Sequence, residues 1–360
     1  MIEGRSRTTI WIVAGIVAGI LIYLLRDVLL PLVAGFAVAY MLDPAVRHLM
    51  RLRLPRGAAS AVALALFFLA AVSLLLMTLP ILQSQIATFA QRLPSYVERL
   101  RTLVEPLFQV LRDRAGIPDV SDLSTLAGKH AAQALGWFGT VIAGLVSGGA
   151  AIVGTLSLLL ITPVVAFYLL RDWHKVVERI DLWLPRTEAE TIRAQLREID
   201  QTLAGFARGQ ALVCFVLALY YAIGLTLCGL DFGILVGVFT GIASFIPVVG
   251  ALAGGVLSIG LALIQFPTWG PVVAAAVVFG LGQVLEGQFL TPRLVGDRVR
   301  LHPVWIIFAL MTGGTLFGFV GLLLAVPVAA AVGVLARFAV ARYLGSPFYR
   351  GHHELPAHRS

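Results

Sequence analysis

The chain has 360 residues, of which 59% are hydrophobic and only 13% are charged, and its mean hydropathy is +0.92. Soluble domains carry about 25% charged residues, so this composition excludes a soluble enzyme, a nucleic-acid-binding module and a disulfide-stabilised secreted domain. The net charge of +8 does not indicate a nucleic-acid partner, because most basic residues flank apolar stretches.

Several long stretches contain no Asp, Glu, Lys or Arg, and a helix that crosses a bilayer needs about 18 apolar residues or more. The stretches are 8–25, 57–91, 131–170, 209–230, 232–285 and 301–336, with a shorter one at 28–42. We therefore predict an all-α, polytopic membrane protein. Some of its transmembrane helices are expected to be broken or re-entrant at Gly and Pro, and further amphipathic helices are expected at the surface.

The pattern divides the chain into six predicted segments. They are an N-terminal three-span unit (1–82), an extracytoplasmic amphipathic helical region (83–149), a fourth span (150–170), cytoplasmic amphipathic helices (171–208), a C-terminal transport core (209–342) and a polar cytoplasmic tail (343–360). Basic residues concentrate at 47–56, at 171–208 and after Arg337. Because positive residues favour the cytoplasmic side, we expect both termini in the cytoplasm.

The region that follows the third span has the apolar spacing of a coiled-coil seam, alternately four and three residues. The seam comprises Ile86, Ala90, Leu93, Val97, Leu100, Val104, Leu107 and Leu111. It crosses Pro94 and Pro106, and each proline is expected to break or kink a helix. Two interpretations stay open: a seam between protomers outside the bilayer, and an arm that packs on its own bundle.

Two uncharged runs are too long for one crossing. At about 1.5 Å per residue, the 54 residues of 232–285 far exceed a bilayer core of about 30 Å, so this run must fold back. The expected positions are Pro247, Gly250, Gly254-Gly255 and Phe266-Pro267 in this run, and Gly313-Gly314 and Pro327 in the run 301–336. A shift of 80 residues aligns Pro247 with Pro327, as in transporters whose paired broken helices expose backbone groups at the substrate site.

Glu286 is an isolated carboxyl group after 54 uncharged positions, with Gln283 and Gln288 close to it in sequence. An ionisable group at membrane depth is costly and points to an ion or substrate pathway, and burial can bring its proton exchange into the physiological pH range. Gln283 precedes it by three residues and can share its helix face. The alternative is a Glu286 near the interface that only pairs with an arginine, such as Arg293.

Other polar residues mark the ends of spans. Arg208 is expected to anchor a span on the cytoplasmic side, Gln210 is a candidate substrate or ion contact, and Asp172 closes the fourth span at the interface. The chain contains no H-E-x-x-H, G-x-S-x-G or G-x-x-x-x-G-K motif and no metal-ligand spacing of Cys and His. We therefore expect no enzyme activity, no metal site and no cofactor.

Several strings resemble those of the autoinducer-2 exporter (AI-2E) family of bacterial inner-membrane transporters. They are Leu-Pro-Arg-Gly-Ala-Ala at 54–59, Phe-Tyr-Leu-Leu-Arg-Asp at 167–172, Arg-Gly-Gln at 208–210, Phe-Ile-Pro-Val-Val-Gly at 245–250, the run from Glu286 to Gly296 with Gln283 before it, His302-Pro303, and the glycines and proline from Gly313 to Pro327. The resemblance covers about 10–345 and is most specific from Gln283 to Pro327. At Gly287 the chain departs from the family, in which Asn is frequent.

The resemblance implies a carrier of about eight helices that exports a small molecule and is a homo-oligomer. Members have been linked to the signal autoinducer-2, and similar proteins to sodium–proton exchange. The expected substrate or ion contacts are Glu286, Gln283, Gln288, Gln210, Pro247, Gly250, Thr291, Pro292 and Pro327, with Arg208, Arg293 and Asp172 in gating or anchoring roles. The alternatives are a sodium–proton antiporter, an uncoupled oligomeric channel and a non-transporting scaffold; substrate, direction, coupling ion and number of protomers stay open.

Overall fold

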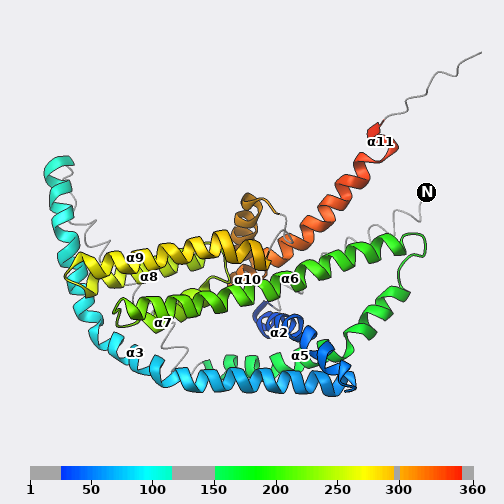
Figure 1. Ribbon diagram of the computed structural model, residues 1–360. Helices are drawn as coiled ribbons and strands as arrows, with labels where there is room; N and C mark the ends of the chain where they lie inside the picture. Colours follow the sequence, from blue (N-terminus) through cyan, green and yellow to red (C-terminus); the bar gives the residue numbers. More distant parts are fainter. Residues whose placement is uncertain (1–25, 116–150, 296–300, 351–360) are drawn as a thin grey trace, which may run out of the picture. The chain divides into compact units, whose positions relative to one another are not determined.

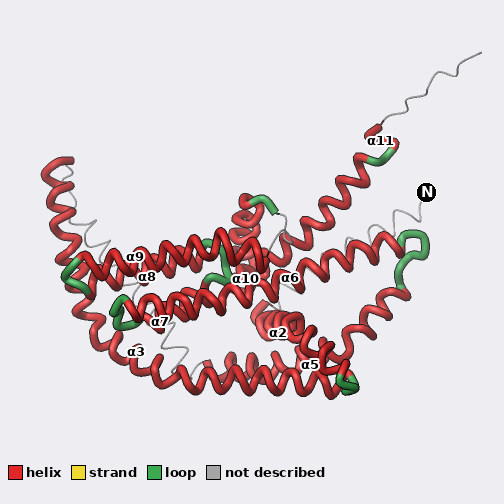
Figure 2. Tube along the Cα trace, viewed as in Figure 1, coloured by secondary structure: helices red, strands yellow, loops and turns green. Residues whose placement is uncertain are grey.

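The computed structural model describes residues 26–115, 151–295 and 301–350. Within these ranges the chain consists of helices joined by short loops, as Figure 2 shows, and it contains no strand. The prediction of an all-α protein is confirmed. The first uncharged stretch, 8–25, and the whole of 131–150 lie outside the described residues.

Figure 1 follows the helices in chain order. They are α2 (Arg26–Arg51), α3 (Arg56–Ala115), α5 (Ala151–Leu182), α6 (Ala189–Leu227), α7 (Gly233–Ala243), α8 (Val249–Gln265), α9 (Trp269–Val284), a π-helical segment (Leu285–Val295), α10 (Pro303–Leu344) and α11 (Pro347–Arg350). Among the described residues, five stretches are long and apolar enough to cross a membrane. They are Leu29–Arg51, Arg56–Phe89, Ala189–Leu227, Trp269–Val295 and Pro303–Leu344.

Helix α3 joins two regions that the sequence pattern assigns to separate segments. The predicted third span and the amphipathic region after it form one continuous helix that reaches Ala115 and passes through Pro94 and Pro106 without a break. Of the predicted coiled-coil seam, only the side chain of Ile86 is described, and it is half-buried. The two interpretations of the seam therefore stay predictions.

The chain divides into two compact units. The first unit contains the described residues of 1–61, 161–210 and 292–360, and the second contains those of 62–160 and 211–291. Helix α10 belongs to the first unit, whereas α7, α8 and α9 belong to the second.

In the second unit, the run 232–285 folds back twice, as its length predicts. The first turn lies between α7 and α8 and contains Pro247, and the second lies at Phe266–Thr268 before α9. At about 1.5 Å per residue, the 11 residues of α7 and the 17 of α8 fall short of a bilayer core of about 30 Å. Helices α7 and α8 form a helical hairpin, which we call the first hairpin.

The first hairpin packs against helix α6. Every fourth residue from Val213 to Leu225 is buried, and the small residues Ala218 and Ala222 lie on the same helix. A Cβ atom at Gly237 would overlap the backbone of Ala222, and one at Gly241 would overlap that of Ala218. Small residues of this kind let membrane helices approach closely, so the glycines of α7 set the distance between α6 and the first hairpin.

In the first unit, α10 is two helices joined by a sharp reversal at Gly318, where φ is 58° and ψ is −136°. The two arms lie against each other, because a Cβ atom at Gly313 would meet Gly321 and one at Gly333 would meet the side chain of Leu301. We call this reversal the second hairpin. The expectation of breaks at Gly313-Gly314 and Pro327 is wrong, since Pro327 lies inside the returning arm.

The 80-residue shift between Pro247 and Pro327 is therefore not a structural correspondence. Pro247 lies in the turn of the first hairpin, whereas Pro327 lies nine residues after the turn of the second. Both runs fold into hairpins, but their turns are related by a different offset.

Candidate transport site

Helix α9 widens at Leu285 into the π-helical segment that ends at Val295. Pro292 lies inside this segment, and a proline in an α-helix lacks an N–H donor and clashes with the carbonyl group four residues earlier. A wider turn, closed by hydrogen bonds between residues i and i+5, relieves that clash. Such turns occur frequently at functional sites, and this one carries Glu286, Gln288 and Thr291.

A chain of hydrogen bonds connects Glu286 to helix α6. The side-chain amide of Gln283 donates to Glu286 Oε2 at 3.5 Å and to the hydroxyl oxygen of Tyr221 at 3.1 Å. The Tyr221 hydroxyl in turn donates to the carbonyl oxygen of Phe279 at 3.4 Å. The predicted pair of Gln283 and Glu286 is thus brought together, and the structure adds Tyr221 to it.

Packing fixes the position of Tyr221. Its side chain is completely buried, its ring stacks on Phe279 with the centroids 5.7 Å apart, and a Cβ atom at Gly282 would overlap it. A buried Tyr normally pairs its hydroxyl group, and here the pairing is with α9. Tyr221 is therefore a rigid support for the amide of Gln283.

Glu286 is half-buried inside the membrane-capable stretch Trp269–Val295. Within the described parts of the chain its carboxyl group forms no ion pair, and the alternative of an interfacial Glu286 that pairs with an arginine stays a prediction. Arg293 is exposed on the π-helical segment, as are Gln288, Thr291 and Pro292. A carboxyl group inside a membrane-crossing helix can exchange a proton or bind a cation.

The turn of the first hairpin is held in an unusual conformation. Val248 has a φ of 70°, which is a strained conformation for a β-branched residue and a feature that clusters at functional sites. Gly250, one of the predicted site residues, is buried against Ser244, and Pro247 is half-buried beside it. The turn therefore brings two predicted residues together within the second unit.

Buried hydroxyl groups follow the contact between α7 and α8. Thr240 on α7, Ser244 at the C-cap of α7 and Ser258 on α8 are each buried, and each hydroxyl donates to the carbonyl group four residues earlier. Thr240 packs against Gly254. Because their own helices satisfy these hydroxyl groups, the interior of the hairpin has no unpaired hydroxyl donor at these three positions.

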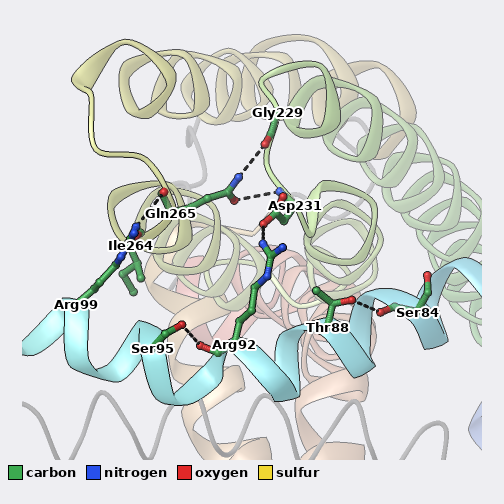
Figure 3. Close-up of polar contacts among 9 residues, drawn as sticks. All are labelled: Ser84, Thr88, Arg92, Ser95, Arg99, Gly229, Asp231, Ile264 and Gln265. Atoms are coloured by element: carbon green, nitrogen blue, oxygen red, sulfur yellow. Dashed lines mark hydrogen bonds and ion pairs between the residues drawn. The ribbon is translucent and has the colours of Figure 1, made fainter.

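Polar side chains of α3 hold the other end of the first hairpin, as Figure 3 shows. Arg92 forms an ion pair with Asp231, and the guanidinium group of Arg99 donates to the carbonyl oxygens of Ile264 at 3.0 Å and Gln265 at 3.2 Å. Those carbonyls lie at the C-terminus of α8, where a cation is favoured. Helix α3 therefore contacts both the loop before α7 and the last residues of α8, and we call this set of contacts the clamp.

The side chain of Gln265 completes this clamp. Its amide nitrogen donates to the carbonyl oxygen of Gly229 at 2.9 Å, and its amide oxygen accepts from the backbone N–H of Asp231 at 3.0 Å. In addition, Gln85 accepts from the backbone N–H of Leu235 at 3.0 Å, near the start of α7. These contacts satisfy backbone groups that the loop before α7 leaves unpaired.

The remaining predicted residues lie in the first unit. Gln210 is buried and Arg208 is half-buried, both on α6. Gly209, between them, packs directly on the backbone of Leu294. Asp172 accepts hydrogen bonds from Arg171 at 2.6 Å and Lys175 at 3.1 Å, and the bond from Arg171 lowers the pKa of its carboxyl group.

Two packing contacts, that of Tyr221 with α9 in the second unit and that of Gly209 with Leu294 in the first, are not predicted from the sequence. The available signals were a tyrosine pair, Tyr220-Tyr221, in the middle of an apolar span, and a glycine inside a predicted helix. Neither signal identifies the helix that it contacts. Among the described residues, no group of three or more His, Cys, Asp or Glu could hold a metal ion.

Comparison with known proteins identifies relatives over nearly the whole chain. A model of a family described as AI-2E family transporter matches residues 10–340. YrrI, a candidate transport protein of Bacillus subtilis, is 28% identical over 311 residues, which cover 86% of each chain. PerM, a candidate permease of Escherichia coli, is 27% identical over 319 residues, which cover 87% of this chain and 88% of PerM.

Proposed function

Because the chain belongs to the AI-2E transporter family, we propose that it exports a small polar solute and that proton or sodium movement drives this export. Its role in membrane transport follows from family membership and from its membrane-capable helices. The proposed solute is a signal of the autoinducer-2 type or a related metabolite.

The observation that carries the proposal is the carboxyl group of Glu286. It lies half-buried in a membrane-capable helix, it has no ion-pair partner among the described residues, and its hydrogen-bond partner Gln283 is itself held by Tyr221. Ionisable groups in this setting are found on proton relays and ion pathways. Glu286 is therefore the proposed coupling group, and Gln283 orients it.

Coupling follows if one carboxyl group accepts either a proton or a sodium ion, but not both. Release of one ion on one side of the membrane frees the group to bind the other ion on the opposite side. The same chemistry without a solute is sodium–proton exchange, which is the second candidate function and rests on the same residue.

Flux in proteoliposomes tests the coupling. We would reconstitute the protein with an internal pH dye, impose sodium and proton gradients, and compare the wild type with Glu286→Gln. Glu190→Gln is the matched control, because Glu190 is an exposed carboxylate of α6 that pairs only with Arg193 among the described residues. We expect sodium-driven proton movement in the wild type and in the control, and at least a ten-fold lower rate in Glu286→Gln, since an amide cannot exchange the proton.

Solute export needs its own assay. Inverted vesicles should accumulate autoinducer-2 when a gradient is imposed, and accumulation should disappear in Glu286→Gln. Equal accumulation without any gradient would favour an uncoupled channel, and no flux of ions or solute would favour a non-transporting scaffold.

The proposed location is a bacterial inner membrane, as a homo-oligomer with both termini in the cytoplasm. Positive residues near 171–208 and after Arg337 support this orientation. In a background without Cys214 and Cys228, a cysteine in place of Arg186 should react with an impermeant thiol reagent only after the cells are permeabilised. Labelling in intact cells would reverse the proposed orientation.

A further inference from the structure

The corner between α2 and α3 combines exposed cations with exposed apolar side chains. We define the α2–α3 corner as the four residues 50–53, which follow one another as Met50, Arg51, Leu52 and Arg53. All four are exposed, with Leu52 at 66% and Met50 at 38%. Backbone hydrogen bonds of 3.0 Å from Leu52 to Leu49 and from Arg53 to Met50 close the turn tightly.

Arg53 ends the turn in an unusual backbone conformation. Its φ of 66° is the left-handed conformation in which helices commonly end with glycine. For a residue with a Cβ atom this conformation is strained. An arginine is present in the position that glycine would fill without strain.

Arg47 and Arg56, on either side of the corner, have partners, whereas Arg51 and Arg53 have none among the described residues. Arg47 and Arg56 both pair with Asp43, and Arg56 also donates to the carbonyl oxygen of Leu170 at 2.7 Å. Neither Arg51 nor Arg53 forms an ion pair or a side-chain hydrogen bond with any part of the chain that the structure describes. The corner therefore presents two uncompensated positive charges on either side of an exposed leucine.

The position of the α2–α3 corner between two membrane-capable stretches indicates a lipid headgroup as its partner. The membrane-capable stretch Leu29–Arg51 ends here, and the next one begins at Arg56, so the corner lies at the depth of lipid headgroups. Guanidinium groups bind phosphate in a bidentate manner, and basic residues next to a span attract anionic lipid. An exposed leucine between two arginines fits a membrane surface better than it fits a soluble anion.

We propose that the α2–α3 corner binds anionic phospholipids, with Arg51 and Arg53 on their phosphate groups and Leu52 at the boundary between headgroups and acyl chains. This site is independent of the proposed transport function. Failure of the flux assays would leave it unchanged, and its own failure would leave Glu286 as the proposed coupling group.

Native mass spectrometry of the full chain in neutral detergent tests the proposal, with dioleoyl phosphatidylglycerol and dioleoyl phosphatidylcholine as the two lipids. We expect the wild type to prefer phosphatidylglycerol. The double variant Arg51→Gln/Arg53→Gln should bind it about five-fold more weakly per arginine removed, or about thirty-fold in total, while its binding of phosphatidylcholine changes less than two-fold. Its unfolding midpoint in detergent alone should match that of the wild type, which shows that it folds.

The matched control is Arg179→Gln/Arg186→Gln, which removes the same charge from two exposed arginines of the first unit. Phosphatidylglycerol binding within two-fold of the wild type in this control supports a site at the corner. Equal weakening in both double variants would overturn the proposal in favour of general electrostatic attraction. Full competition by inorganic phosphate at the same concentration would instead indicate a site for a soluble anion.

Discussion

The two hairpins are built from similar uncharged, glycine-rich sequence, yet they turn back by different means. The first uses a five-residue connection between α7 and α8 that contains Pro247 and the strained Val248. The second turns at Gly318 alone. The first hairpin packs on α6, and side chains of α3 hold it at the end opposite its turn. A glycine reversal needs only the absence of a side chain.

The two hairpins also differ in what their glycines contact. In the first hairpin, glycines of α7 pack closely against another helix, α6. In the second, Gly313 and Gly321 pack against each other. The first hairpin is therefore defined by its neighbours and the second by its own two arms. This difference predicts which substitutions disturb the rest of the unit and which act locally.

The largest expected effect is that of Gly237→Leu in the first hairpin. The added side chain meets the backbone of Ala222, which cannot rotate away, and overpacking of this kind costs about 1–3 kcal/mol or more. We expect loss of most of the monodisperse protein in size-exclusion chromatography. Gly260→Leu is the control, because a Cβ atom there meets nothing within 4 Å. Equal yields of the two variants would contradict the close approach of α6 and α7.

The next effect is that of Gly318→Ala in the second hairpin. Nothing lies within 4 Å of the added methyl group, so the whole effect comes from a backbone conformation that only glycine adopts easily, at about 1–3 kcal/mol. The midpoint of thermal unfolding should fall, while Gly260→Ala should leave it unchanged or raise it. An unaltered midpoint in Gly318→Ala would mean that the reversal lies elsewhere.

A smaller effect is expected from the clamp on the first hairpin. The ion pair of Arg92 and Asp231 is exposed, with 51% and 34% of the two side chains accessible, and exposed pairs contribute about 0–1 kcal/mol. A double-mutant cycle with Arg92→Gln and Asp231→Asn, followed by unfolding, should give a coupling energy in that range that decreases with salt. Zero coupling would show that Arg99 and Gln265 hold the hairpin without the ion pair.

The smallest effect concerns the end of the second hairpin's returning arm, where Arg342 donates to both carboxylate oxygens of Glu188, at 3.0 and 3.1 Å. This bond lowers the pKa of Glu188 from its ordinary value of 4.5. The stabilisation is therefore present above pH 4.5 and is lost as the pH falls through the lowered value. Unfolding midpoints of the wild type and Glu188→Gln should differ slightly at pH 7 and converge as the pH falls through the lowered pKa of Glu188. A difference that persists at low pH would contradict this role.

The sequence predicted the reversal of the run 232–285 and its two turns at Pro247 and Phe266-Pro267, but the breaks expected at Gly250 and Gly254-Gly255 are wrong, since these glycines lie inside α8. The reason is physical: the run is too long for one crossing, and Pro247 and Phe266-Pro267 are the residues that interrupt helices. The same reasoning failed in α10, where Pro327 stays inside a helix and Gly318 makes the turn. A proline can be accommodated in a membrane helix when the freed backbone groups find other partners, and a single sequence does not reveal those partners.

The candidate site was predicted to a similar extent. The pair of Gln283 and Glu286 followed from their spacing on one helix, and the structure brings them within 3.5 Å. Tyr221 was not predicted, because it comes from α6, 62 residues earlier in the chain. The roles of Gln210, Gln288, Thr291, Pro292, Arg208 and Arg293 stay predictions.

The sequence by itself determined that the chain is an all-α membrane protein whose uncharged runs fold back and whose isolated carboxyl group follows one of them. These conclusions depend only on composition and length. A helix that crosses a bilayer core of about 30 Å must be apolar, and an uncharged run much longer than one crossing must fold back. Only the tertiary structure decided that Tyr221 supports Gln283, that α3 clamps the first hairpin, and that Gly318 turns the second. Such contacts join residues far apart in the chain, and their geometry depends on side chains that pack across helices.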